Sequence, residues 1–238
     1  MAVGADKSSD VSGPQQLSLE VRLRDDATFA NFYGPSAQAC VHALQTQMDA
    51  GGEQAVYLWG GSGSGKSHLL QACCHASPSL YLPLAELRDY PAAEVLHSAE
   101  VMARVCVDDL HLIAGRAEWE LALFHFINRA RERACNLVFA ADAAPRSLPL
   151  QLPDLQSRLA WGAVYALPRL SDEDKAAILQ FRAERRGLVL SDAVCRYIIG
   201  RAPREMHELL DLLDKLDAAS LRQKRALSKP FIKQTLGW

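Results

Sequence analysis

The sequence lacks a strong excess of charge, a long apolar run and any C-x-x-C pair of cysteines. Its 238 residues carry a formal net charge of −2 with a pI near 6.4, which argues against a surface built mainly to hold DNA. No run approaches the roughly 20 apolar residues of a membrane span, and residues 1–14 lack the apolar core of a signal peptide. The six cysteines form no C-x-x-C pair and lie mostly in apolar segments, which favours buried thiols and a cytoplasmic location.

A phosphate-binding pattern stands out in this balanced background. Residues 56–67 read VYLWGGSGSGKS and contain G-x-x-x-x-G-K-S, preceded by a strand-like apolar run and followed by a helix-like run that begins at His68. Glycines let the backbone N–H groups face a polyphosphate, and the helix N-terminus adds the positive end of its dipole. The predicted phosphate-binding residues are Gly60, Gly61, Gly63, Gly65, Lys66 and Ser67. Lys66 is expected on the β- and γ-phosphates and Ser67 on Mg²⁺, and the alternative is a flexible glycine loop that happens to precede a lysine.

Acidic residues close two further apolar strands. Residues 104–107 end in Asp108 and Asp109, a pattern that suits one carboxylate for the magnesium shell and one for orienting the attacking water. We assign the metal role to Asp108 and the water role to Asp109; the alternative is that they cap the next helix. Asp142 follows the strand 137–141 and is a candidate sensor of the γ-phosphate, or else a simple turn former before Pro145.

Several other positions carry weaker signals. Phe29 and Phe32 either wall an adenine pocket or pack on the core. Arg158, by itself, is only a surface arginine. Arg204 follows a proline in the first turn of a helix, where a cation opposes the dipole unless an anion lies nearby, so a phosphate contact is slightly favoured over a solvated charge.

The chain divides into four predicted parts. Residues 1–14 are small and polar, and we expect them to be disordered. Residues 15–23 alternate apolar and polar side chains, as expected of an edge strand or of an extended peptide captured by another protein, and the pattern leaves both open. Residues 24–169 alternate five strands with helices, including helices expected at 36–50, 92–99 and 118–133, and residues 170–238 read as helical throughout. The predicted fold is α/β, a five-stranded parallel sheet with flanking helices followed by a small all-helical lid, with nucleotide between them.

Taken together, these motifs resemble the DnaA family of AAA+ ATPases over nearly the whole chain after residue 15. The matching stretches, in family order, are 28–32, the P-loop with residues 68–70, 107–109, 142–145, 157–162 and 204–205. The resemblance implies that Asn31 and Phe32 lie by the adenine and that His68 belongs to the nucleotide site. It also makes Asp142 the first sensor, Arg158 the arginine finger and Arg204 the second sensor.

Within this family the sequence looks most like the short regulatory paralogues that inactivate the initiator. It ends at Trp238, where the initiator continues into a helix-turn-helix domain, and Gln16, Leu17, Ser18, Leu19 and Val21 resemble a sliding-clamp peptide. The ending Glu20-Val21 departs from the hydrophobic or proline-containing ending usual in such peptides.

The likeness implies an ADP- or ATP-bound protein with Mg²⁺, weak or no hydrolysis of its own, and Arg158 supplied in trans to ATP on the initiator DnaA. Its partners would be DnaA and the β sliding clamp of DNA polymerase, with DNA contacted only indirectly, no membrane, and a possible homodimer. The alternatives are an AAA+ helicase loader or DNA-binding adaptor, which predicts a basic face, and a P-loop kinase or ATPase for a small molecule, which leaves the arginines and the lid without a shared explanation.

Overall fold

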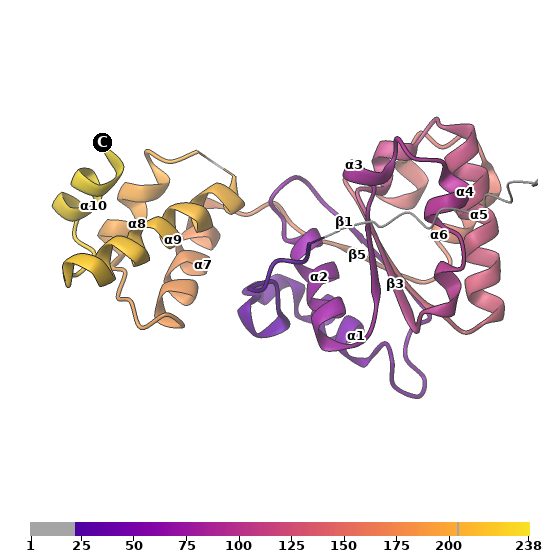
Figure 1. Ribbon diagram of the computed structural model, residues 1–238, viewed down its shortest axis with the longest axis horizontal. Helices are drawn as coiled ribbons and strands as arrows, with labels where there is room; N and C mark the ends of the chain where they lie inside the picture. The colour runs from indigo at the N-terminus through magenta and orange to yellow at the C-terminus, as the bar shows by residue number, and fades with distance from the viewer. Residues whose placement is uncertain (1–21, 204) are drawn as a thin grey trace, which may run out of the picture.

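The computed structural model describes residues 22–203 and 205–238. The predicted peptide at residues 16–21 and the predicted second sensor Arg204 therefore lie outside the described residues. An α/β part and a helical part lie side by side along the long axis of the molecule (Figure 1), so the fold class predicted from the sequence is confirmed. In the described part of the chain no helix is both long and apolar enough to cross a membrane.

The α/β part is built on one parallel sheet in the order β2-β3-β4-β1-β5. Side chains on both faces are buried, as in β1, where Val56 and Leu58 pack on one side and Tyr57 on the other. A parallel sheet covered on both faces has near-continuous apolar strands, which is why these runs were recognisable in the sequence. The strands are β1 (Ala55–Trp59), β2 (Leu80–Pro83), β3 (Arg104–Asp108), β4 (Asn136–Ala141) and β5 (Ala163–Ala166).

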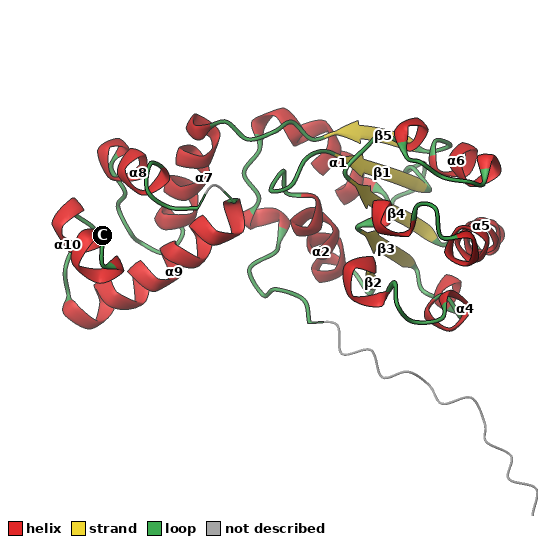
Figure 2. Cartoon of the chain, turned by 90° about the horizontal axis from the view of Figure 1, so that it is seen from above, coloured by secondary structure: helices red, strands yellow, loops and turns green. Residues whose placement is uncertain are grey.

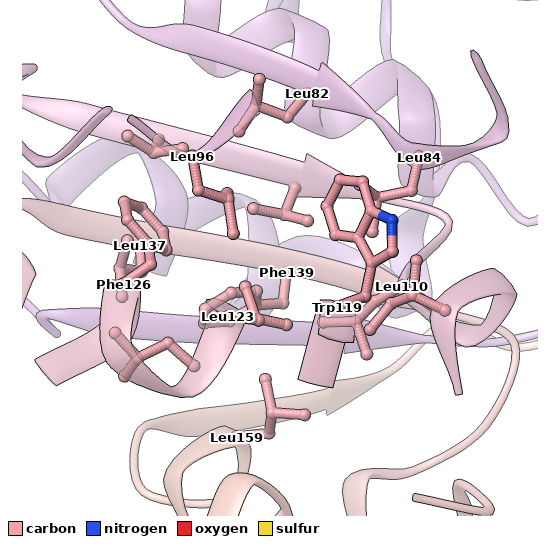
Figure 3. Close-up of a cluster of buried hydrophobic side chains, with 14 of the residues drawn as sticks. Leu82, Leu84, Leu96, Leu110, Trp119, Leu123, Phe126, Leu137, Phe139 and Leu159 are labelled. Carbon is pink, nitrogen blue, oxygen red and sulfur yellow. The ribbon is translucent and has the colours of Figure 1, made fainter. Parts of the chain in front are cut away.

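Helices cover the sheet on both sides (Figure 2). On one face α1 and α2 close a smaller core around Leu44, Leu69 and Leu70. On the other face α4, α5 and α6 close the main core, where Trp119 and Phe126 of α5 pack over Phe139 of the sheet (Figure 3). The helices of this part are α1 (Gln38–Thr46), α2 (Lys66–Ala76), α3 (Leu84–Leu87), α4 (Ala92–Val95), α5 (Ala117–Glu132) and α6 (Pro153–Leu159).

The helical part has a core of its own, built around Leu179, Leu213 and Phe231. Its first helix begins with a capping box, because the Ser171 hydroxyl accepts from the Asp174 N–H while the Asp174 carboxylate accepts from the Ser171 N–H. The helices are α7 (Asp172–Glu184), α8 (Asp192–Ile199), α9 (Met206–Gln223) and α10 (Lys229–Leu236).

Some predicted helices differ in extent from the structure. The helix expected at 36–50 starts as a 3₁₀ turn at Pro35–Ala37 and its α-helical part ends at Thr46. The helix expected at 92–99 stops at Val95, with Leu96 as its C-cap. Ser98 has a left-handed φ of 57° and begins a separate 3₁₀ turn, so the chain does not continue as one helix. Helix α10 lies inside the predicted helical part, but no separate helix was predicted at its position.

Candidate functional site

The P-loop connects β1 to α2 and its backbone conformation depends on glycine at particular positions. Gly63 and Gly65 have φ values of +73° and +95°, which residues with a Cβ rarely adopt. A Cβ on Gly65 would lie 2.8 Å from the ring of Phe32, and a Cβ on Gly60 would lie 2.4 Å from the carbonyl of Leu167. The loop therefore needs its glycines both for conformation and for close packing.

Lys66 is a buried cation that forms hydrogen bonds with the backbone of its own loop. Its Nζ donates to the carbonyls of Gly60 over 2.7 Å and Gly61 over 2.9 Å, and the side chain is 8% exposed. Burial lowers the pKa of Lys66, and the nearby carboxylates, led by Asp108, act in the opposite direction. The ammonium group therefore lies in a site that an additional anion would stabilise.

The end of β3 presents the two acidic residues in different environments. Asp108 is buried and accepts hydrogen bonds from the Tyr81 hydroxyl over 2.7 Å and from the Asp109 N–H over 2.9 Å. Burial, and next the charge of Asp108, raise the pKa of Tyr81 far above its ordinary value, so the hydroxyl stays protonated as a donor. Asp109 has a left-handed φ of 55°, and burial followed by the charge of Asp108 raises its pKa. Strained backbone and a raised pKa together are typical of a functional carboxylate.

A histidine that sequence reasoning missed lies among these acids. His111 Nδ1 is 4.0 Å from Asp142 Oδ1, and the charge of His111 lowers the pKa of Asp109 against the stronger effects of burial and Asp108. The signal available in the sequence was its place two residues after the acidic pair. Asp142 is exposed at the end of β4 and lines the same cavity as Asp109 and His111.

A cavity of about 540 Å³ brings most of the predicted site residues together. This volume is in the range of ordinary small-molecule sites. Gly60 and Gly61 belong to the loop but do not line the cavity, and Asp108 is buried and does not line it either. The predicted residues that line it are Asn31, Phe32, Gly63, Gly65, Lys66, Ser67, His68, Asp109 and Asp142.

A segment of residues 24–32, which we call the strap, runs along α2 beside this cavity. His68 holds the strap, because its Nε2 lies 2.8 Å from the carbonyl of Thr28 and must carry the proton, since a carbonyl only accepts. Burial lowers the pKa of His68 and the bond to Thr28 offsets this only in part, so the ring is neutral at pH 7. The Phe32 ring lies 5.6 Å from the His68 ring.

The helical part, which is the predicted lid, also binds this strap through hydrogen bonds. Arg182 of α7 is 3% exposed, forms an ion pair with Asp26 and donates to the carbonyl of Asn31 over 3.3 Å. Arg185 donates to Asn31 Oδ1 over 2.8 Å. Asn31 is thus a residue that ties the strap to the lid, a role that its family position alone did not reveal.

A second contact joins the lid to the P-loop itself. The Ser62 hydroxyl donates to Glu205 Oε2 over 3.0 Å, and a Cβ on Gly63 would lie 3.3 Å from the same carboxylate oxygen. Glu205 directly precedes α9, so the start of this helix meets the phosphate-binding loop. Sequence reasoning missed Glu205, Tyr81 and Arg182, because their partners are distant in the chain.

Arg158 is not among the residues that line the cavity. It lies in the last turn of α6, half-buried, with its guanidinium 6.0 Å from the centre of the Phe124 ring on α5. Trp161, three residues further along the chain, is largely exposed, and the guanidinium carbon of Arg131 lies 4.4 Å from the centre of its ring. The structure therefore separates the predicted arginine finger from the other predicted catalytic residues.

The donor set suits a polyphosphate and a hard divalent cation. Lys66 and the loop N–H groups can bind phosphate oxygens, and Ser67, which also lines the cavity, can supply a hydroxyl oxygen. Asp108 accepts one hydrogen bond on each oxygen, which leaves lone pairs for the water shell of a magnesium ion.

Comparison with known families matches both parts of the chain. The family described as the lid domain of Hda matches residues 172–236, and the bacterial DnaA ATPase domain matches residues 84–166. An uncharacterized protein of Haemophilus influenzae is 40% identical over 228 residues, which are 93% of this chain and 98% of that protein.

Solved structures share the fold at low sequence identity. Domain III of DnaA from Thermotoga maritima is 22% identical with a TM-score of 0.72 and covers 91% of this chain and 98% of its own. DnaA of Aquifex aeolicus with AMPPCP is 19% identical with a TM-score of 0.67 and covers 85% of this chain and 69% of its own. The RuvB motor of Thermotoga maritima reaches a TM-score of 0.63 at 16% identity, over 90% of this chain and 72% of its own. The chain belongs to the DnaA-like AAA+ proteins and is close to Hda within them.

Proposed function

We propose that this protein is a regulatory inactivator of the replication initiator DnaA. In this proposal it binds ADP or ATP with Mg²⁺ in its own cavity, docks on the DNA-loaded sliding clamp, and presents Arg158 to ATP held by a neighbouring initiator. The initiator is then left with ADP, which prevents re-initiation of replication. The match to the Hda lid and to the DnaA ATPase domain supports a partner of the DnaA type.

Nucleotide binding is supported by the cavity described above. Phe32 and Asn31, which the proposal assigns to the adenine, line this cavity together with Lys66 and Ser67, which it assigns to phosphate and to Mg²⁺. Asp108, which it assigns to the magnesium shell, is buried at the end of β3. Bound Mg²⁺ would neutralise charge on the β- and γ-phosphate oxygens. Asp109 would orient water and Asp142 would contact the γ-phosphate. Because the second sensor Arg204 lies outside the described residues, its role stays a prediction.

The observation that carries the proposal is the placement of Arg158. Its half-buried guanidinium lies on α6 against Phe124, outside the residues that line the chain's own cavity. An arginine in that position is available to a nucleotide on another molecule, where it stabilises the charge that develops during phosphoryl transfer. Arginine fingers supplied in this way accelerate hydrolysis by about 10³ to 10⁵.

The clamp peptide at residues 16–21 remains a prediction from the sequence, since it lies outside the described residues. The direct partners in the proposal are therefore the initiator and the clamp, with DNA reached through the clamp. A homodimer belongs to the same proposal.

The test follows single-turnover hydrolysis of ATP prebound to purified DnaA, with this protein added in the presence and absence of DNA-loaded clamp. We expect acceleration only when both are present and at least a hundredfold less with Arg158→Ala. Arg201→Ala is the matched control, because Arg201 also stacks on an aromatic ring, at 4.5 Å from the centre of Tyr197, but lies in the lid.

Two outcomes contradict the proposal. Equal stimulation by Arg158→Ala and the unmodified protein removes the finger assignment. If neither clamp nor protein changes the rate, the inactivator function is wrong, and an AAA+ helicase loader or DNA-binding adaptor becomes the better explanation.

A further inference from the structure

A chain of hydrogen bonds runs from the strap to the buried carboxylate at the end of β3. The backbone N–H of Arg24 donates to Gln71 Oε1 over 2.9 Å. Gln71 Nε2 in turn donates to the Tyr81 hydroxyl oxygen over 3.3 Å, and the Tyr81 hydroxyl donates to Asp108 Oδ2 over 2.7 Å. Every donor in this chain therefore points toward Asp108.

The sheet explains why Tyr81 reaches this carboxylate. Strands β2 and β3 are parallel neighbours, and Tyr81 pairs with Cys106, two residues before Asp108 on the same strand. Residues two apart lie on the same face of a strand, so Asp108 is the diagonal neighbour of Tyr81 and within reach of a long aromatic side chain.

Gln71 fixes the direction of the chain of hydrogen bonds. Gln71 is 8% exposed, and its amide oxygen and nitrogen face different partners, a backbone donor and a hydroxyl acceptor. A buried amide with both ends paired has one orientation, because the flipped amide would place donor against donor at Arg24. The Tyr81 proton is thereby directed to Asp108.

These hydrogen bonds determine the orientation of the Asp108 carboxylate. Its Oδ1 is held by the Asp109 N–H and its Oδ2 by Tyr81, so the plane of the carboxylate is fixed by one contact at each oxygen. One lone pair on each oxygen remains for the waters of a metal ion. Groups that orient a carboxylate near a metal commonly change metal affinity without contacting the metal.

We infer that Tyr81 is a positioning residue that holds Asp108 for the magnesium-dependent part of nucleotide binding, with Gln71 orienting its hydroxyl. This inference rests on the proposed nucleotide site. It assigns to Tyr81 and Gln71 a role that neither the P-loop pattern nor the acidic pair contains.

The test measures ADP affinity by isothermal titration calorimetry with excess Mg²⁺ and, separately, with EDTA. Tyr81→Phe keeps the ring and removes only the hydroxyl, so we expect ADP affinity to fall about tenfold with Mg²⁺ and to stay unchanged with EDTA. Gln71→Met has a similar length without the amide and should show a smaller loss of the same kind. Tyr165→Phe is the matched control, because Tyr165 lies on the other edge strand, β5, and does not line the cavity.

The outcomes separate this inference from the nucleotide proposal. If the unmodified protein binds ADP more tightly with Mg²⁺ and Tyr81→Phe does not change that difference, the inference is wrong and nucleotide binding stands. An equal loss with Mg²⁺ and with EDTA assigns Tyr81 a general structural role and also overturns it. If the unmodified protein binds neither ADP nor ATP, the proposed function itself fails. Should Tyr81→Phe fail to fold by circular dichroism, Gln71→Met decides the question in the same two titrations.

Discussion

The ion pair between Asp26 and Arg182 should be the strongest single link between the strap and the lid. Arg182 is 3% exposed and Asp26 is 32% exposed, so the pair lies between the surface and fully buried extremes. Surface pairs contribute about 0.2–1 kcal/mol, and breaking a buried pair costs about 3–5 kcal/mol. We therefore expect a coupling energy of about 1.5–3 kcal/mol. Asp26→Asn alone should be strongly destabilising, because it removes the negative charge that balances the buried guanidinium of Arg182.

The measurement is a double-mutant cycle of Asp26→Asn and Arg182→Met in urea unfolding followed by circular dichroism. Methionine keeps most of the apolar stem of the arginine and removes its charge. Asp25→Asn is the matched control, because Asp25 is an adjacent exposed carboxylate. A coupling energy below about 0.5 kcal/mol would show that the pair behaves like a surface contact and refute this reasoning.

The same pair predicts a pH dependence. Burial raises the pKa of Asp26. The hydrogen bond from Arg182 and the charges of Arg24 and Arg182 lower this pKa by more than burial raises it, so the net shift is downward. A depressed carboxylate pKa stabilises the fold above the unfolded value of about 4, and this stabilisation disappears as the pH falls through the lower folded value. The difference in unfolding free energy between the unmodified protein and Asp26→Asn should therefore be full at pH 7 and shrink below about pH 4; a constant difference would contradict the assignment.

Two further predictions concern the P-loop. Lys66→Ala should weaken ADP binding about a hundredfold in calorimetry, since the ammonium that now binds the carbonyls of Gly60 and Gly61 is the cation available to phosphate; unchanged affinity would remove Lys66 from the site. Glu205→Gln should tighten ADP binding about two- to fivefold, because it removes a negative charge that lies 3.0 Å from the Ser62 hydroxyl in this loop; weaker binding would show that the carboxylate helps to order the loop instead.

The sequence was sufficient for the sheet and for the residues that chain geometry alone brings together. The strands are nearly continuous apolar runs because both faces of the sheet are covered, and the acids at the ends of β3 and β4 meet because the carboxyl ends of parallel strands share one edge. Lys66, Asp109 and Asp142 line one cavity for this reason. The predicted lengths of helices were less accurate. One of them ends at Val95, and the left-handed backbone of Ser98 begins a separate turn that its residue type does not indicate.

The partners of the strap could not be predicted because they form across long stretches of chain. Asp26 meets Arg182 after 156 residues and Ser62 meets Glu205 after 143 residues, and nothing local marks either pair. The face of α2 that binds the strap could not be predicted from the sequence either. His68 and Gln71 project from the same side of α2 and both bind the strap. The resemblance placed His68 in the nucleotide site, but nothing in the sequence indicated that either residue binds residues 24–28.

The strap matters for the site because its contacts lie on both sides of the cavity. From α2 it is held by His68 and Gln71, and from the lid by Arg182 and Arg185. A nucleotide in this cavity would contact elements that the strap already links, so the cost of ordering the lid is partly met before binding. An asparagine and a phenylalanine at the end of the strap therefore have a place in the site, although neither is a usual phosphate ligand and neither could be assigned from local sequence alone.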